Sequence, residues 1–158
     1  MPQLLIDYIL RGKVKCVVRD FPLEAEHPHG LQAAEAAHCA NDQGKFWPIH
    51  DALIGNSDAL DRPKLSLYAQ DIGLDLATFD KCVDSGKYAS KIKEMMAGGK
   101  RLGVDGTPVF FLGKTDASGH KIESLHRFDG AIPFPKLEEA IDKLLAEQKP
   151  LATPAASH

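Results

Sequence analysis

The spacing of hydrophobic residues predicts helices over most of this chain. Apolar side chains three and four positions apart favour an amphipathic helix. This spacing occurs in residues 1–9, repeatedly within residues 28–102, and again near the C-terminus. The C-terminal example is the clearest, and it is formed by Leu137, Ile141, Leu144 and Leu145. A helix with this pattern presents a continuous apolar stripe to a core.

Strand-like patterns are fewer. Residues 13–21 carry apolar side chains at alternate positions, which predicts a strand that ends at Pro22. Residues 109–112 form a short continuous apolar run, and residues 122–128 follow it after a turn-forming cluster at residues 116–119. This pair predicts a β-hairpin. The predicted order is therefore helix, strand, several helices, hairpin and helix.

Glycine residues divide the apolar pattern of residues 28–102 into separate helices. Gly44 and Gly73 each follow the last periodic residue of a segment, where glycine commonly ends a helix. Asp75 directly precedes the next segment and is a favourable N-cap. The last helix of the block is expected to weaken at the two glycines of residues 98–99.

Composition and charge narrow the class of protein. The 158 residues are 44% hydrophobic and 26% charged, which suits one compact globular domain. The net charge is −3 and no dense lysine or arginine stripe occurs, which argues against nucleic-acid binding. No apolar run approaches the roughly 18 residues of a membrane span, so no membrane insertion is expected. Arg11 and Lys13 follow the first apolar residues instead of preceding them, which is the reverse of a signal peptide.

The three cysteines and the histidines offer few catalytic patterns. Cys16, Cys39 and Cys82 are widely separated, so the sequence contains no Cys-x-x-Cys and no zinc-ribbon spacing. Cys16 alternates with valines, which favours a small core residue over a reactive thiol. His27, His29 and His38 could suggest a metal site, but no carboxylate or cysteine set completes the ligand group. His50-Asp51 could suggest a catalytic pair, but no Gly-x-Ser-x-Gly supports a hydrolase. We expect no metal and no cofactor.

Three segments together resemble the DsbA-like branch of the thioredoxin superfamily. They are residues 12–23, residues 33–51 with the run Gln43-Gly44-Lys45-Phe46-Trp47, and residues 103–111. The similarity extends from Met1 to about Leu145. It implies an α/β, thioredoxin-like fold in which residues 13–21 form an edge strand and the hairpin and last helix follow a helical insertion.

The resemblance also implies a domain organisation and a binding loop. It predicts a single domain over residues 1–149, with a DsbA-type helical insertion at about residues 28–102 and a flexible tail at residues 150–158. Thr107 and Pro108 resemble the family's cis-proline loop. A cis X–Pro bond exposes the backbone of the preceding residue, which can then pair with an extended substrate segment. These two residues are the predicted substrate-binding site.

The family's central strand and Cys-x-x-Cys have no counterpart in this sequence. The resemblance places Met1 inside the active-site helix, so the strand and both cysteines would lie upstream, and the domain is predicted to be N-terminally truncated with no catalytic residue. A start late within a longer protein and a protein that works without thiols both explain this. Residues 13–21 would then lack a partner, and unpaired backbone groups are costly. We expect direct re-pairing or a second chain, as in a homodimer, to close the sheet.

Some members of the family carry a structural disulfide at positions that match Cys39 and Cys82. The resemblance makes this pair a disulfide candidate, and two buried reduced thiols are the alternative. A disulfide closing a loop of this length would stabilise the fold by about 3–4 kcal/mol, mainly by restricting the unfolded chain.

The resemblance implies thiol:disulfide oxidoreductase activity for the parent family, namely oxidation or isomerisation of disulfides in exported proteins. The expected partners are extended polypeptides or protein thiols, and the expected compartment is periplasmic or extracytoplasmic if an upstream signal exists. Without the cysteine pair, this chain is expected to be redox-inactive as given. A thiol-independent peptide-binding or chaperone-like module is the alternative. A glutathione-dependent enzyme of the kappa-class type is a third reading, which residues 43–47 fit less well.

Overall fold

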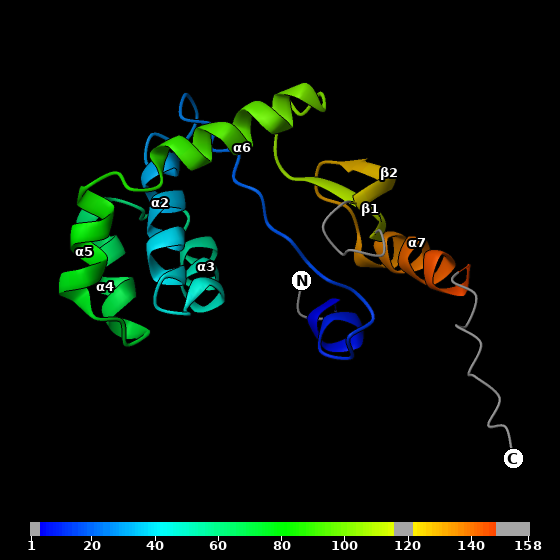
Figure 1. The fold of residues 1–158 in the computed structure, drawn as a ribbon, viewed down its shortest axis with the longest axis horizontal. Coiled ribbons are helices and arrows are strands. Elements are labelled where there is room, and N and C mark those ends of the chain that lie inside the picture. Colours follow the sequence, from blue (N-terminus) through cyan, green and yellow to red (C-terminus); the bar gives the residue numbers. More distant parts are fainter. Residues whose placement is uncertain (1–3, 116–121, 148–158) are drawn as a thin grey trace, which may run out of the picture. The chain divides into compact units, whose positions relative to one another are not determined.

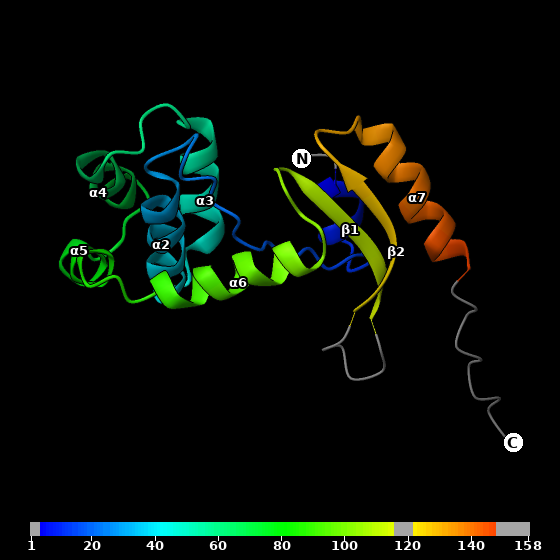
Figure 2. The same cartoon turned by 90° about the horizontal axis from the view of Figure 1, so that it is seen from above.

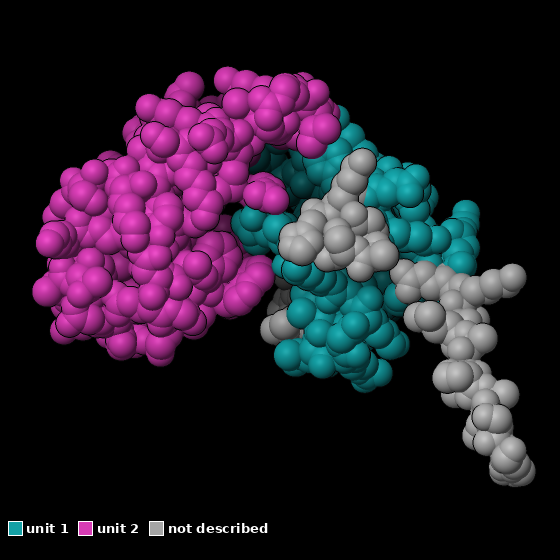
Figure 3. Space-filling model, in the orientation of Figure 1, with its two compact units in different colours: residues 1–18, 106–158 teal, residues 19–105 magenta. Residues whose placement is uncertain are grey.

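The computed structural model describes residues 4–115 and 122–147, which form helices and one pair of strands (Figure 1). By their contacts, residues 19–105 form a helical unit, and residues 1–18 with residues 106–158 form a hairpin unit (Figure 3). In chain order the elements are η1 (Leu5–Ile9, a π-helix), α2 (Gly30–Asn41), α3 (Phe46–Gly55), α4 (Arg62–Asp71), α5 (Leu76–Asp84), α6 (Ala89–Arg101), β1 (Val109–Thr115), β2 (Ile122–Asp129) and α7 (Phe134–Ala146).

The element order agrees with the sequence prediction except at residues 13–21. The predicted turn at residues 116–119 and the predicted tail at residues 150–158 lie outside the described residues. The single domain over residues 1–149 stays a prediction. None of the helices in the described ranges is long and apolar enough to cross a membrane.

Helix α2 is the centre of the helical unit, where it contacts α3, α4, α5 and α6. Figure 2 shows these helices gathered around it. Small buried side chains on α2 allow close approach of its neighbours, and they are Ala33, Ala36, Ala37, Cys39 and Ala40. Ile49, Leu65 and Phe79 pack into the same core and are fully buried. The insertion therefore has a hydrophobic core of its own.

Local signals in the sequence set the ends of these helices. The Asp75 carboxylate accepts a hydrogen bond from the backbone N–H of Thr78 at 2.8 Å, which confirms the predicted N-cap of α5. Asp61 caps α4 in the same way through the backbone N–H of Lys64. Gly73 follows α4 with a φ of 72°, a conformation that favours glycine.

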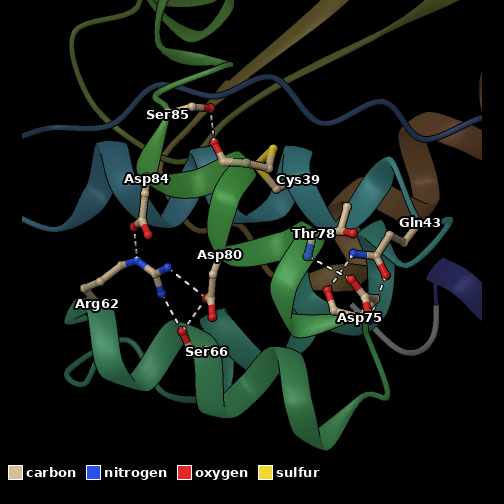
Figure 4. Close-up of polar contacts among 10 residues, drawn as sticks. Cys39, Gln43, Arg62, Ser66, Asp75, Thr78, Asp80, Asp84 and Ser85 are labelled. Atoms are coloured by element: carbon tan, nitrogen blue, oxygen red, sulfur yellow. Dashed lines mark hydrogen bonds and ion pairs between the residues drawn. A yellow bond between two sulfur atoms is a disulfide. The ribbon is translucent and has the colours of Figure 1, made fainter.

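An ionic cluster joins α4 to α5 within the helical unit (Figure 4). The Arg62 guanidinium donates to Asp84 at 2.7 Å and to Asp80 at 2.8 Å. The Ser66 hydroxyl also donates to Asp80, at 2.7 Å. The Arg62 guanidinium of α4 therefore contacts two carboxylates of α5, which links the two helices through charge-assisted hydrogen bonds.

Helix α6 does not weaken at Gly98 and Gly99, contrary to the sequence prediction, and continues to Arg101. Its packing explains the second glycine. A Cβ atom at Gly99 would lie 2.8 Å from a ring carbon of Phe21, whereas a Cβ atom at Gly98 would meet nothing closer than 3.7 Å. Gly99 therefore lets α6 approach the Phe21 ring, and packing overrides the weak helix propensity of glycine.

The hairpin unit consists of β1 and β2 in antiparallel pairing, with α7 packed against β1. The register shifts between Leu112 and Gly113. A Cβ atom at Gly113 would lie 2.0 Å from the carbonyl oxygen of Glu123, so this irregular position excludes any larger residue. The core of the unit is formed by the buried residues Leu4, Tyr8, Leu137 and Ile141.

Residues 13–21 do not form the predicted strand. Residues 14–23 have no regular secondary structure, and within the described ranges no backbone–backbone hydrogen bond involves residues 14–22. The prediction is wrong because alternation of side chains gives a strand only where a neighbouring ladder supplies backbone partners. In the described part of the chain, the sheet contains β1 and β2 alone, so it is not closed by re-pairing with this segment.

Candidate functional site

The predicted binding loop lies between α6 and β1. The peptide bond between Thr107 and Pro108 is cis, and both side chains are exposed. The Pro108 carbonyl oxygen accepts a hydrogen bond from the Gly130 N–H at 2.8 Å, which ties the loop to the end of β2. Among the described residues, no backbone–backbone hydrogen bond involves Thr107. The loop thus presents an exposed residue with free backbone groups from an anchored position.

The other predicted site residues lie in the helical unit. Cys39 on α2 and Cys82 on α5 form a disulfide, with 5.8 Å between their Cα atoms (Figure 4). Cys39 is 1% exposed, and Cys82 lies at the edge of the same core. A thiolate attacking this disulfide has no access to the sulfur of Cys39.

A charged cluster lies beside the sulfur of Cys82. The Asp42 carboxylate accepts hydrogen bonds from the Lys87 ammonium at 2.7 Å and from the Tyr88 hydroxyl, and one of its oxygens lies 3.9 Å from Cys82 Sγ. The hydrogen bond from Lys87, followed by that from Tyr88, holds the pKa of Asp42 below its usual value. A carboxylate that stays ionised disfavours a thiolate at Cys82 after reduction.

Cys16 is the remaining cysteine, and it is free and half-buried in the hairpin unit. Burial raises the pKa of its thiol above the usual value. The thiol form therefore dominates at neutral pH, whereas attack on a disulfide requires the thiolate. None of the three cysteines combines an accessible sulfur with an environment that favours the thiolate.

The histidines of the described ranges do not converge on a metal site. Within residues 4–115 and 122–147, no group of three or more histidine, cysteine or acidic side chains is placed to bind a metal ion. His38 instead pairs with Asp20 at 2.7 Å and stacks on the Tyr88 ring. His50 contacts its neighbour Asp51 at 3.3 Å. This partly buried contact links Asp20, which precedes the helices of the unit in the chain, to His38 on α2.

Sequence reasoning missed the roles of two residues in the run Gln43–Trp47. The Gln43 side chain donates to the carbonyl of Asp75 at 3.2 Å and accepts from its N–H at 2.9 Å (Figure 4). The Lys45 ammonium donates to the carbonyl of Ile72 at the end of α4, at 3.2 Å, a favourable position for a cation. The sequence signal was the long polar side chain on each side of Gly44. Each of these side chains can reach the backbone between α4 and α5.

The family model described as thioredoxin matches residues 1–149, nearly the whole chain. The chain belongs to this family. The crystal structure of alpha-DsbA1 from Wolbachia pipientis superimposes on this thioredoxin-family chain with a TM-score of 0.75. The two are 26% identical, and the match covers 92% of this chain and 75% of that one. The fold is thus thioredoxin-like and of the α/β class, and this family member is DsbA-like, as its sequence predicts.

Curated relatives of this thioredoxin-family chain carry another name. The Na(+)/H(+) antiporter NhaA 3 of Salinispora tropica is 36% identical over 124 residues, which are 78% of this chain and 19% of the antiporter. The antiporter NhaA of Herminiimonas arsenicoxydans is 36% identical over 99 residues, or 63% of this chain and 16% of that protein. This chain therefore spans at most about a fifth of the length of these relatives.

Proposed function

We propose that this DsbA-like chain binds extended polypeptides at Thr107 and Pro108 and does not itself catalyse thiol–disulfide exchange as given. The observation that carries the proposal is the state of its three sulfur atoms. Cys39 and Cys82 are bonded to each other, with Cys39 buried and Cys82 beside an ionised carboxylate. Cys16 is half-buried, with a raised pKa.

Oxidase turnover tests the redox half of the proposal. The purified chain, with its disulfide intact, is mixed with a reduced model substrate and an excess of oxidised glutathione, and disulfide formation is followed. We expect the rate of the uncatalysed mixture, because no low-pKa thiol is available to attack. Turnover that depends on the chain and disappears in Cys16→Ser would contradict the proposal.

Peptide binding tests the other half. Binding of unfolded polypeptide to Cys16→Ser, which keeps the disulfide, is compared with binding to Thr107→Arg and to Thr115→Arg. Thr115 is a matched control because it is also exposed, at the far end of β1. We expect Cys16→Ser and Thr115→Arg to bind normally and Thr107→Arg to bind weakly. Equal binding by both arginine variants would show that Thr107 and Pro108 are not the polypeptide-binding site.

The compartment and the oligomeric state are further parts of the proposal. We place the chain in a periplasmic or other extracytoplasmic compartment, because structural disulfides persist where the environment is oxidising. Alkylation of cellular protein before lysis should leave Cys39 and Cys82 unmodified. We also propose a homodimer in which a second copy of the chain closes the sheet. Sedimentation equilibrium should then give twice the mass of one chain.

A further inference from the structure

One face of α2 contacts the end of α5 and the connection of residues 85–88, which leads into α6. Figure 2 shows α6 beginning beside α2. Four residues at helical spacing share this face, and they are Glu35, His38, Cys39 and Asp42. The last three have partners within residues 82–88, through ring stacking, the disulfide and two hydrogen bonds respectively. These contacts hold the start of α6 against α2.

Glu35 differs from the other three because its carboxylate is buried and incompletely paired. The residue is 7% exposed, and its Oε1 atom has no hydrogen-bond partner among the described residues. A Cβ atom at Gly86 would lie 3.6 Å from this oxygen, so the oxygen faces the backbone of the connection. An ionised carboxylate at this position loses its hydration without replacement. The ionised form is therefore costly as long as the contact stays closed.

The groups around Glu35 compensate this cost only in part. The backbone N–H of Ala89 and the charge of Lys93, both on α6, favour the ionised carboxylate. No ion pair joins Lys93 to Glu35 within the described ranges, however, and no other described charged group acts on the carboxylate. Burial has the largest effect, and it raises the pKa of Glu35 above its usual value. The other titratable groups of this contact already have partners, and they are His38, Asp42, Lys87 and Tyr88.

We propose that Glu35 and residues 85–89 form a proton-sensitive latch between α2 and the start of α6. When Glu35 is protonated, the neutral carboxyl group is tolerated in the buried contact and the latch stays closed. When Glu35 is ionised, the latch opens more often, because opening returns the carboxylate to water. All residues of the latch lie within the helical unit of residues 19–105. The inference depends neither on thiol chemistry nor on the Thr107 loop.

The direction of the pH effect follows from the two states of the latch. In the open state the Glu35 carboxyl is exposed and has its usual pKa of 4.5, whereas burial raises the pKa in the closed state. The closed state holds the proton more tightly, so it is fully stabilised below about pH 4.5 and loses stability as the pH rises through the higher pKa. Within this window, opening should become up to about tenfold more frequent for each unit of pH.

Hydrogen exchange of the full chain from about pH 4 to pH 8 tests the latch. After correction for the intrinsic exchange rate, the amides of residues 89–92 should exchange faster as the pH rises, whereas those of α4 should not respond. Glu35→Gln is neutral at every pH and should abolish the response, whereas any response due to His38 would persist in it. Lys93→Met removes a charge that favours the ionised carboxylate, so the response should move to higher pH.

Glu94→Gln is the matched control, since it removes the same charge from an exposed residue of α6. It should keep the response of the unmodified chain. Circular dichroism checks that each variant is folded, and the unmodified chain with Lys93→Met still decides the question if Glu35→Gln does not fold. The proposal is overturned if exchange in residues 89–92 does not respond to pH, or if Glu35→Gln responds as the control does. It is also overturned if Lys93→Met leaves the response in place, or if α4 responds equally, because the whole helical unit then opens together.

Discussion

At the scale of single residues, charges near sulfur decide what the cysteines can do. Asp42 interacts with Cys82 across 3.9 Å, and its own partners Lys87 and Tyr88 keep it ionised. An ionised carboxylate stabilises the neutral thiol over the thiolate. The same carboxylate therefore joins α2 to the start of α6 and suppresses the reactivity of Cys82.

Replacing Asp42 by Asn should make reduced Cys82 more reactive. The negative charge disappears and the Lys87 ammonium remains, so reduced Cys82 should form its thiolate at a lower pH. The rate of iodoacetamide alkylation as a function of pH, measured on the reduced chain with Cys16→Ser, shows this change. Asp71→Asn, at an exposed position on α4, is the control and should leave the profile unchanged. An unchanged profile for Asp42→Asn would show that the carboxylate does not act on the sulfur.

Tyr8 gives the hairpin unit a dependence on high pH. Burial, followed by the hydrogen bond that its hydroxyl donates to Asp142 at 2.8 Å, raises its pKa from 10.0 to about 12. The folded state holds the proton more tightly than the unfolded state, so stability is complete below pH 10 and falls as pH rises toward 12. Thermal unfolding from pH 8 to 12 should show this fall in the unmodified chain. Tyr8→Phe should show less of it, whereas Tyr68→Phe should keep it in full.

At the scale of elements, the sequence predicts most of the fold because its helices carry local signals. Asp75 caps α5, Gly73 follows α4, and the apolar stripe of α7 is visible in the spacing of its leucines. Residues 13–21 show the limit of such reasoning. Alternating side chains describe a surface that could pair, but a strand also requires backbone partners, and these are not visible in a local pattern.

A local pattern also does not show how the two glycines of α6 are packed. Gly98→Ala should stabilise the chain by up to about 1 kcal/mol, because alanine favours a helix and the site is open. Gly99→Ala should destabilise it by about 1–3 kcal/mol, because the new Cβ atom would overlap the Phe21 ring. Urea unfolding of the two variants measures both effects. Similar effects in the two variants would mean that the Phe21 ring can move away freely.

At the scale of the whole molecule, the candidate sites are divided between two units. Thr107, Pro108 and Cys16 belong to the hairpin unit, and the disulfide belongs to the helical unit. The resemblance to a family points to the Thr107-Pro108 loop and to the disulfide pair from the sequence alone, because both are matched to positions in family members. It cannot show that Asp42 lies beside Cys82 or that Gln43 holds the start of α5, since those contacts join residues about 30 to 40 positions apart through the packing of α2.

The division into units predicts which helices lose stability when the disulfide is removed. Replacing Cys39 and Cys82 by alanine removes a crosslink between residues 43 positions apart. The free energy of unfolding should fall by about 4 kcal/mol, because the unfolded chain is no longer restricted. Both cysteines lie within residues 19–105, so the helical unit should open locally more often. Hydrogen exchange should therefore quicken at the buried amides of α2 and α5 and stay nearly constant in α7. The Cys16→Ala variant is the control and should leave α2 unchanged. Equal acceleration in α2 and α7 would instead show that residues 1–149 unfold as one cooperative domain, because opening of either unit would then require opening of the other.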